Sequence, residues 1–256
     1  YRLLDLVGLD TSVKVTEGVI NSCPDDEYVS QLRTKPTPKH TQFLLDNKWL
    51  GNKSGQGYYK KSDEKDENGK SIIYQLNLDT LEYEKRMLDA LGIAKKVEIM
   101  SKRLNDMINA QDESGQFIKE FFSGLLSYAG NRVPEISDSI YGIDDAMKAG
   151  YAWGYGPFEY WDLIGFERGI EIISETGNQL PSWIGAMQAN GVSAFYRYEG
   201  GVKQYFDTIQ NKYINVPVAP TVLHLDSVRS KNPVFKNSEC TIHDIGDQVM
   251  CLEFNT

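Results

Sequence analysis

The sequence predicts a mainly α-helical protein built around one motif that occurs twice, with a β-hairpin between the copies and a short β segment near the C-terminus. The motif reads DLVGLD near the start of the chain and DLIGFE, within GPFEYWDLIGFE, near the middle. Apolar residues at helical spacing dominate both copies, and turn-forming residues flank short β-prone runs. A repeated motif indicates that one structural unit was duplicated.

The composition sets the size and excludes some partners. The chain has 256 residues, 41% of them hydrophobic, so it can bury the core of one large domain or of two small ones. Its 27 basic and 36 acidic side chains give a net charge of −9, which argues against a surface for nucleic acid or anionic membrane. No apolar run approaches the roughly 18 residues that a membrane span needs.

The first copy is predicted to hold two helices, a turn and the start of a hairpin. Residues 10–22 and 37–47 show helical patterns, and three glycines within 51–57 predict a turn that ends at Tyr58 and Tyr59. β-prone runs at 57–60 and 71–76 flank the charged stretch KSDEKDENGK, which we interpret as the solvated hairpin tip. The sequence starts inside this copy, so we expect the first unit to lack its N-terminal part.

The second copy is predicted to begin with long helices. Residues 80–110 carry one apolar stripe, and 117–129 form a more apolar helix. The stripe consists of Leu88, Leu91, Val97, Met100, Leu104, Met107 and Ile108. Ser137 or Asp138 is expected to cap a third helix, which ends at Gly150.

Shorter elements follow towards the C-terminus. Pro157 is expected to open a short helix that Gly165 separates from the next, and Pro181 to start a helix that ends at Asn190-Gly191. Residues 216–228 are rich in Pro and Val, and 240–254 predict two strands around a Gly-Asp turn. The expected division is therefore a first copy at 1–60, a hairpin and connector at 61–92, a second copy at 93–200, and a linker with a further β segment at 201–256.

The sequence offers no catalytic, cofactor-binding or metal-binding motif of its own. GNKSGQG, residues 51–57, lacks the order GxxxxGK[ST] of a phosphate-binding loop, and no GxGxxG follows a predicted strand. His40, His224 and His243 are isolated in sequence, which argues against a metal site. The three cysteines have no paired spacing and no signal peptide opens the chain, so we expect reduced thiols in a cytoplasmic protein.

The sequence also contains several polar pairs and one aromatic cluster. Asp144–Asp145 and Glu135–Asp138 are interpreted as helix caps and solvated helix faces rather than acid–base pairs. Asn131-Arg132 follows an apolar helix and is either a helix-end interaction or a polar pair at a cleft. The cluster of Tyr151, Trp153, Phe158 and Trp161 is expected in a core where helices cross.

These residues, taken in order, resemble the C-terminal helical domain of 3-hydroxyacyl-CoA dehydrogenases, a fold like that of the 6-phosphogluconate dehydrogenase C-terminal domain. The resemblance covers residues 1–60 and 93–198. It rests on the ordered segments LDLVGLDT and LGNKSGQGYY in the first copy, and NRVPEI, IDDAM, GPFE and DLIG in the second. The tail from Asn237 to Phe254 resembles, more weakly, the first strands of an enoyl-CoA hydratase.

The resemblance implies a piece of a multifunctional fatty-acid β-oxidation enzyme that oxidises (S)-3-hydroxyacyl-CoA with NAD. In that family a Rossmann domain holds NAD and a His–Glu pair; both are expected upstream of Tyr1, so this chain alone is expected to bind no cofactor and to be inactive. The family's Asn-Arg motif matches Asn131-Arg132, which makes these two residues the substrate-cleft candidates. The two copies are expected to pack as an intrachain pseudo-dimer, and a homodimer is also open.

Two other interpretations remain open. One is an association module that binds no small molecule, and the other is the helical domain of another NAD-linked family such as the 6-phosphogluconate dehydrogenases. The ordered NRVPEI, IDDAM and GPFE segments and the hydratase-like tail argue against the last of these.

Overall fold

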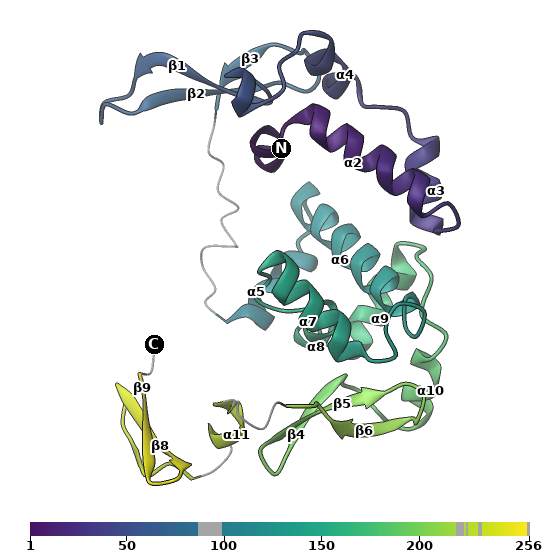
Figure 1. The fold of residues 1–256 in the computed structure, drawn as a ribbon, viewed down its shortest axis with the longest axis vertical. Helices are drawn as coiled ribbons and strands as arrows, with labels where there is room; N and C mark the ends of the chain where they lie inside the picture. The colour runs from purple at the N-terminus through teal and green to yellow at the C-terminus, as the bar shows by residue number, and fades with distance from the viewer. Residues whose placement is uncertain (87–98, 219–222, 224, 230–231, 255–256) are drawn as a thin grey trace. The chain divides into compact units, whose positions relative to one another are not determined.

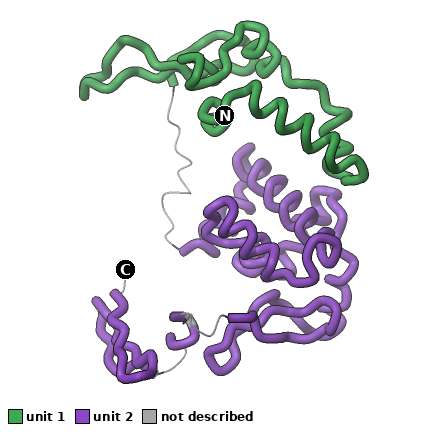
Figure 2. Tube along the Cα trace, in the orientation of Figure 1, with its two compact units in different colours: residues 1–89 green, residues 90–256 purple. Residues whose placement is uncertain are grey.

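The computed structural model describes residues 1–86, 99–218, 223, 225–229 and 232–254. The chain divides into unit 1, residues 1–89, and unit 2, residues 90–256 (Figure 2). The described residues hold more helix than strand, as the sequence predicts.

Unit 1 consists of short helices followed by a three-stranded sheet (Figure 1). Its helical elements are α1 (Arg2–Val7), α2 (Leu9–Ser22), α3 (Glu27–Thr34), α4 (Lys39–Asp46) and the 3₁₀ turn η1 (Asn52–Ser54). Strands β1 (Tyr59–Lys65), β2 (Ser71–Leu76) and β3 (Tyr83–Lys85) form an antiparallel sheet in that order. Leu9, Leu44, Tyr58 and Leu76 form the core, so the helices pack on the residue before β1 and on the last residue of β2.

Unit 2 repeats this order of helices and sheet on a larger scale. Its helices are α5 (Met100–Ile108), α6 (Glu113–Asn131), α7 (Ile140–Tyr151), α8 (Pro157–Ile164), α9 (Phe166–Glu175) and α10 (Ile184–Ala189). Strands β4 (Tyr196–Glu199), β5 (Val202–Asp207) and β6 (Lys212–Asn215) form a second antiparallel sheet in the order β4-β5-β6. One core joins them, with Phe158, Trp161 and Phe195 fully buried at its centre.

The last described segments are α11 (Asp226–Arg229), β7 (Phe235–Lys236), β8 (Cys240–Gly246) and β9 (Val249–Phe254). The two strands expected at 240–254 are confirmed as the β8–β9 hairpin, which turns at Asp247 and Gln248 with positive φ. The predicted hairpin of unit 1 is confirmed by β1 and β2.

Several sequence expectations are wrong in detail. The helix expected to start near Thr80 is contradicted at β3, because Tyr83 pairs with Leu76 across the sheet and tertiary pairing overrides local propensity. Neither α3 nor the sheet β4-β5-β6 was predicted. Helix α7 begins after Ser139, not Ser137 or Asp138, and runs one residue past Gly150 to Tyr151.

Two further expectations are confirmed for only some of their residues. Phe158 and Trp161 lie in the core as expected, whereas Tyr151 is 71% exposed because it lies at the end of α7, so the core assignment is wrong for that residue. Of the apolar stripe, Leu104 and Ile108 are buried, while Leu88, Leu91 and Val97 lie outside the described residues.

Candidate functional site: buried carboxylates that join helices to sheets

The aspartate of the first motif is the structural centre of unit 1. Asp5 is 4% exposed, and its two carboxylate oxygens accept the backbone N–H groups of Tyr58 and Tyr59, each at 2.8 Å. A carboxylate that accepts two backbone donors satisfies groups that the start of β1 would otherwise bury unpaired. The two hydrogen bonds of Asp5 therefore hold α1 against the start of β1.

The glycines of GNKSGQG make room for this carboxylate. A Cβ atom on Gly57 would lie 2.2 Å from the Asp5 Oδ1 atom, and one on Gly51 would lie 2.3 Å from the Asp5 carbonyl oxygen. Gly51 also has a φ of 105°, a left-handed conformation that favours glycine. The segment is thus a turn, as expected, and the structure adds that it packs against Asp5.

The aspartate of the second motif makes the same pair of contacts in unit 2. The Asp162 carboxylate accepts the N–H groups of Phe195 and Tyr196, each at 2.8 Å. Burial raises the pKa of Asp162 to about 6, against the opposing effect of these two hydrogen bonds. We call the Asp5 and Asp162 arrangements the two carboxylate clamps.

Other contacts around the two clamps also correspond. Gly8 and Gly165, three residues after each aspartate, have φ/ψ of 100°/131° and 103°/136°. In both units a tyrosine of the third strand donates its hydroxyl to the carbonyl just before the clamped pair, Tyr83 to Gly57 and Tyr213 to Ala194.

The cations over these tyrosines correspond as well. The Lys60 ammonium lies 4.2 Å from the Tyr83 ring centroid, and the Arg197 guanidinium lies 4.1 Å from that of Tyr213. Such contacts stabilise by roughly 0.5–2 kcal/mol, depending on how far the cation is desolvated. The sheet of unit 1 and the sheet of unit 2 therefore have corresponding hydrogen bonds and ring contacts, in addition to the same strand order.

Unit 2 contains a second buried carboxylate at the start of α8. Asp144, on α7, is fully buried and accepts the N–H groups of Phe158 at 2.9 Å and Glu159 at 3.0 Å. It also accepts the Tyr196 hydroxyl at 2.8 Å. Burial raises its pKa to about 7, while these three hydrogen bonds lower it. Asp144 is thus a helix cap, as the sequence suggested. It caps α8, the helix that follows its own, and it lies in the core and not on a solvated face.

Tyr196 joins the two carboxylates of unit 2. Its backbone N–H is bound by Asp162 and its hydroxyl by Asp144, and burial raises the pKa of the phenol well above its ordinary value. Helix α8 is therefore held at its N-terminal end by Asp144 and near its C-terminal end through Asp162.

A charged network lies beside this joint. Glu159 binds Lys148 at 3.1 Å and Lys203 at 2.7 Å and accepts the Gly156 N–H at 3.0 Å. Burial acts to raise the pKa of Glu159, but the hydrogen bonds from Lys203 and Gly156 outweigh it and lower the pKa. A cavity of about 410 Å³ borders the network. Because both lysines pair with Glu159, the cavity does not present them as uncompensated cations.

The two predicted substrate-cleft residues lie at the end of α6 and make local contacts. The Asn131 amide donates to the carbonyls of Ser127 at 2.9 Å and Gln179 at 3.0 Å, which ties α6 to the loop before α10. Arg132 pairs with Glu135 at 2.9 Å and lies 5.2 Å from the Tyr128 ring centroid. The structure places Asn131 and Arg132 next to each other at a helix end.

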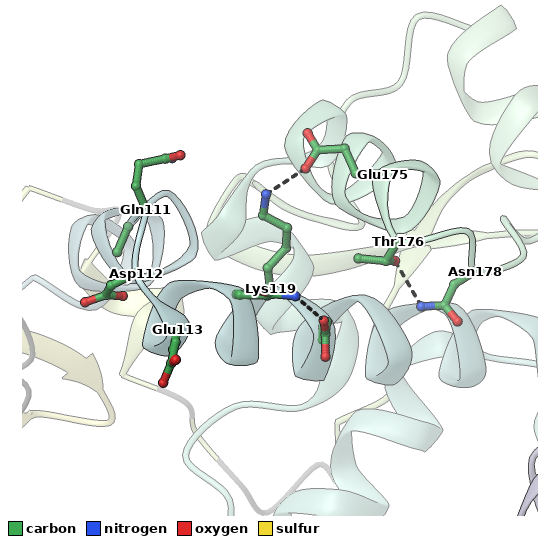
Figure 3. A pocket seen from close by; sticks show the side chains of 10 residues that line it. Gln111, Asp112, Glu113, Lys119, Glu175, Thr176 and Asn178 are labelled. Carbon is green, nitrogen blue, oxygen red and sulfur yellow. Dashed lines mark hydrogen bonds and ion pairs between the residues drawn. The ribbon is translucent and has the colours of Figure 1, made fainter.

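A polar groove of about 690 Å³ lies between α6 and the end of α9 (Figure 3). Among the lining residues, Lys119 pairs with Glu175 at 2.9 Å and Asn178 donates to Thr176 at 3.0 Å. Asn178 also donates to the buried Ser123 at 2.9 Å. These contacts join α6 to α9. Within the described ranges, no group of three or more His, Cys, Asp or Glu side chains is arranged to hold a metal ion. No described helix is long and apolar enough to cross a membrane.

Sequence reasoning missed Asp5, Asp162 and Tyr196 as key residues, although it found the motifs that contain them. Each aspartate binds backbone more than 30 residues away, which no local pattern reveals. The available signal was the recurrence itself: each motif aspartate is followed later by a paired aromatic, Tyr58-Tyr59 or Phe195-Tyr196.

Comparisons with known proteins agree with the sequence resemblance. No family model matches the chain. A protein of Bacillus subtilis (strain 168) named "Probable 3-hydroxyacyl-CoA dehydrogenase" is 34% identical over 260 residues, which covers 100% of this chain and 31% of that protein. A protein of Rickettsia prowazekii named as a fatty acid oxidation complex trifunctional enzyme is 30% identical over 174 residues, or 64% of this chain and 22% of that protein.

A third relative, named "Fatty acid oxidation complex subunit alpha", from Psychrobacter arcticus, is 36% identical over 36% of this chain and 12% of its own length. The chain therefore spans less than a third of the relatives it matches. Their names support the resemblance to 3-hydroxyacyl-CoA dehydrogenases and to multifunctional oxidoreductases of fatty-acid oxidation.

Proposed function

We propose that the chain is part of an NAD-dependent (S)-3-hydroxyacyl-CoA dehydrogenase of fatty-acid β-oxidation, in which it supplies the helical domains next to the acyl-CoA cleft. The observation that supports this most is the 34% identity to the Bacillus subtilis relative, because it extends over the whole chain. The parent enzyme would act in the cytoplasm on acyl-CoA substrates.

We also propose that units 1 and 2 are copies of one module. The support is the correspondence between the Asp5 and Asp162 clamps, together with the matching Tyr83 and Tyr213 hydrogen bonds. On this proposal the second copy includes the sheet β4-β5-β6 and reaches residue 215 instead of 200. The copies would associate through helical faces as an intrachain pseudo-dimer, with a homodimer as the alternative.

The described residues do not fit an NAD site. The three described sheets are antiparallel, and no GxGxxG segment links a strand to a helix, whereas dinucleotides bind at the glycine-rich turn of a parallel βαβ unit. NAD would therefore be held by another part of the parent enzyme, and no catalytic step is assigned to residues of this chain.

Measurement of NAD reduction with 3-hydroxybutyryl-CoA tests this assignment. We expect the longer polypeptide to turn over the substrate and the 256-residue chain to show none. Turnover by this chain alone would contradict the proposal, and so would an inactive longer polypeptide that is folded.

Asn131 and Arg132 remain the proposed substrate-cleft pair. Calorimetry of the chain with an acyl-CoA distinguishes this from the alternative of an association module that binds no small molecule. Binding in the micromolar range that Arg132→Gln weakens supports the cleft role; the absence of heat supports the module. The control is Lys102→Gln, which removes one positive charge from α5 and should leave the binding unchanged.

The tail is proposed to begin a hydratase-like part. The support is the β8–β9 hairpin at the residues that carry the weaker resemblance. An enoyl-CoA hydration assay on the longer polypeptide tests it, since a folded longer polypeptide with dehydrogenase activity and no hydratase activity would contradict it.

A further inference from the structure

The β8–β9 hairpin of unit 2 buries polar side chains on one of its faces. Thr241 pairs with Glu253 and His243 with Cys251 across the two strands, so these four side chains lie on the same face. Thr241 and His243 are each only 5% exposed. A buried polar side chain is costly unless its donors and acceptors find partners, so the partners of His243 decide what this face can do.

Glu253 binds one ring nitrogen of the buried histidine. Its Oε2 atom lies 3.0 Å from His243 Nε2, and its Oε1 atom accepts a hydrogen bond from Nε of Arg229, on α11, at 2.9 Å. The hydrogen bonds from Arg229 and His243 lower the pKa of Glu253. Because an ionised carboxylate only accepts hydrogen bonds, His243 donates to it from Nε2.

The other ring nitrogen of His243 is therefore an acceptor. A neutral imidazole with its proton on Nε2 carries a lone pair on Nδ1. No described residue forms a hydrogen bond with this Nδ1 atom, and His243 lines a cavity of about 460 Å³. The cavity thus offers an acceptor that can receive a donor from a ligand.

The same cavity carries a positive charge. Lys236, on β7, lines it and forms no ion pair with a described carboxylate. Arg229 lines it too, and Glu253 balances the charge of this guanidinium. The cavity therefore favours an anion, although the whole chain has a net charge of −9.

The acceptor and the charge together select among anions. A carboxylate or a sulfate is deprotonated at neutral pH and presents only acceptors to the cavity. A phosphate group has a second pKa of about 6, so near neutral pH it can keep one P–OH donor beside its charged oxygens. Such a group can donate to His243 Nδ1 and accept from Lys236, which matches both features of the cavity.

We propose that the cavity bounded by α11 and the β7–β8–β9 sheet binds a phosphate group, free or as a monoester, through His243 Nδ1 and the Lys236 ammonium. Glu253 is a positioning residue, because it fixes the proton of His243 on Nε2. The proposal does not depend on the dehydrogenase or the hydratase assignment.

Calorimetry of the 256-residue chain with inorganic phosphate and with sulfate tests the selectivity. We expect phosphate to bind at least about fivefold more tightly, because sulfate leaves the Nδ1 acceptor without a donor. Equal affinity for the two anions, or no binding of phosphate in any form, would overturn the proposal.

Adenosine monophosphate and adenosine identify the source of the phosphate group. Adenosine monophosphate that binds more tightly than inorganic phosphate indicates a monoester ligand, and equal or weaker binding indicates free phosphate. Adenosine that binds as tightly as its monophosphate would count against a phosphate site.

A lysine substitution tests the charge. Lys236→Gln should weaken phosphate binding about threefold to tenfold, whereas Lys212→Gln, on β6 and outside the cavity, should leave it unchanged. Both lysines are exposed on strands, so both variants are expected to fold. Undiminished binding in Lys236→Gln, or the same loss in both variants, would contradict the assignment.

The nitrogen chemical shifts of His243 test the role of Glu253. We expect the wild-type ring to carry its proton on Nε2, and phosphate to shift Nδ1 of His243 but not that of His40. Glu253→Gln presents an amide donor to Nε2, so it should move the ring proton to Nδ1 and reduce or reverse the preference for phosphate over sulfate. A wild-type proton on Nδ1, or an unchanged preference in Glu253→Gln, would overturn the positioning role and the acceptor on which the proposal depends.

Discussion

The two units use one clamp in two different surroundings. In both, an aspartate at the end of a helix accepts two backbone N–H groups at the start of a strand. In unit 2 the aromatic residue after the clamp is also fastened through its hydroxyl to Asp144, whereas the matching Tyr59 of unit 1 is not bound to a described carboxylate. The comparison teaches that the motif specifies the joint between helix and sheet, and that in unit 2 a carboxylate of a neighbouring helix, Asp144 on α7, adds one more hydrogen bond to it.

Removal of a clamp carboxylate should have the largest effect. Asp162→Ala leaves the N–H groups of Phe195 and Tyr196 without their acceptor in the core, and each buried unpaired donor costs about 1–3 kcal/mol. We expect unit 2 to lose several kcal/mol of unfolding free energy, measured by denaturant titration of Trp fluorescence. Asp145→Ala, on the exposed side of α7, is the control.

The same substitution in unit 1 sharpens the comparison. Asp5→Ala should destabilise unit 1 and leave the transition of unit 2 in place. If Asp5→Ala or Asp162→Ala lowers the unfolding free energy by less than about 0.5 kcal/mol, the clamp carboxylate is not what holds the sheet to the helices.

Opposite substitutions of the residue before the clamped pair should cost different amounts in the two units. Gly57→Ala puts a methyl group against the Asp5 carboxylate and should cost about 1–3 kcal/mol through overpacking. Ala194→Gly, at the matching position of unit 2, should cost only about 0.5–1 kcal/mol through chain entropy. Thermal unfolding of both variants measures the difference, and equal losses would mean that the two turns are equivalent.

Removal of the tyrosine hydroxyl should destabilise unit 2 more than unit 1. Tyr196→Phe removes the hydrogen bond to Asp144 and should cost about 1.5 kcal/mol, the lower range for a bond to a charged group. Tyr59→Phe in this chain should cost less than about 0.5 kcal/mol, as surface substitutions do. Chemical unfolding of the paired variants distinguishes them; a larger loss for Tyr59→Phe would reverse the comparison.

The buried carboxylates of unit 2 should also make its stability depend on pH. The folded-state pKa values of Asp144 and Asp162, about 7 and about 6, lie above the ordinary value of 3.8, so the folded state of unit 2 binds more protons than the unfolded state in between. Stability from these groups is therefore greatest at low pH and falls as pH rises from about 4 to 7, with a slope of up to about 1.4 kcal/mol per pH unit for each group.

Substitution by asparagine tests that sign. Asp144→Asn and Asp162→Asn should each flatten the decline between pH 4 and 7, whatever they do to absolute stability, whereas Asp145→Asn should not. A decline that persists in the double variant would assign it to other groups.

Sequence reasoning predicted the helices better than the joints between them. The patterns around α2, α4, α6, α8 and α9 are local and amphipathic, so periodicity found them. Strand β3 was missed because its three residues are defined by pairing with β2 and not by a run of β-prone side chains. Asp144 was placed on a solvated face because nothing near it in sequence shows that Tyr196 covers it.

Tyr196 also has a consequence for how unit 2 opens. Its contacts reach back 34 residues to Asp162 and 52 residues to Asp144, so the sheet cannot separate from the helices without breaking a hydrogen bond to the carboxylate that caps α8. The amide protons of Phe158 and Glu159 at one end of α8, and those of Phe195 and Tyr196 at the start of the sheet, should become accessible in a single opening event. One phenol ring would thus make a short helix and a distant strand a single cooperative unit.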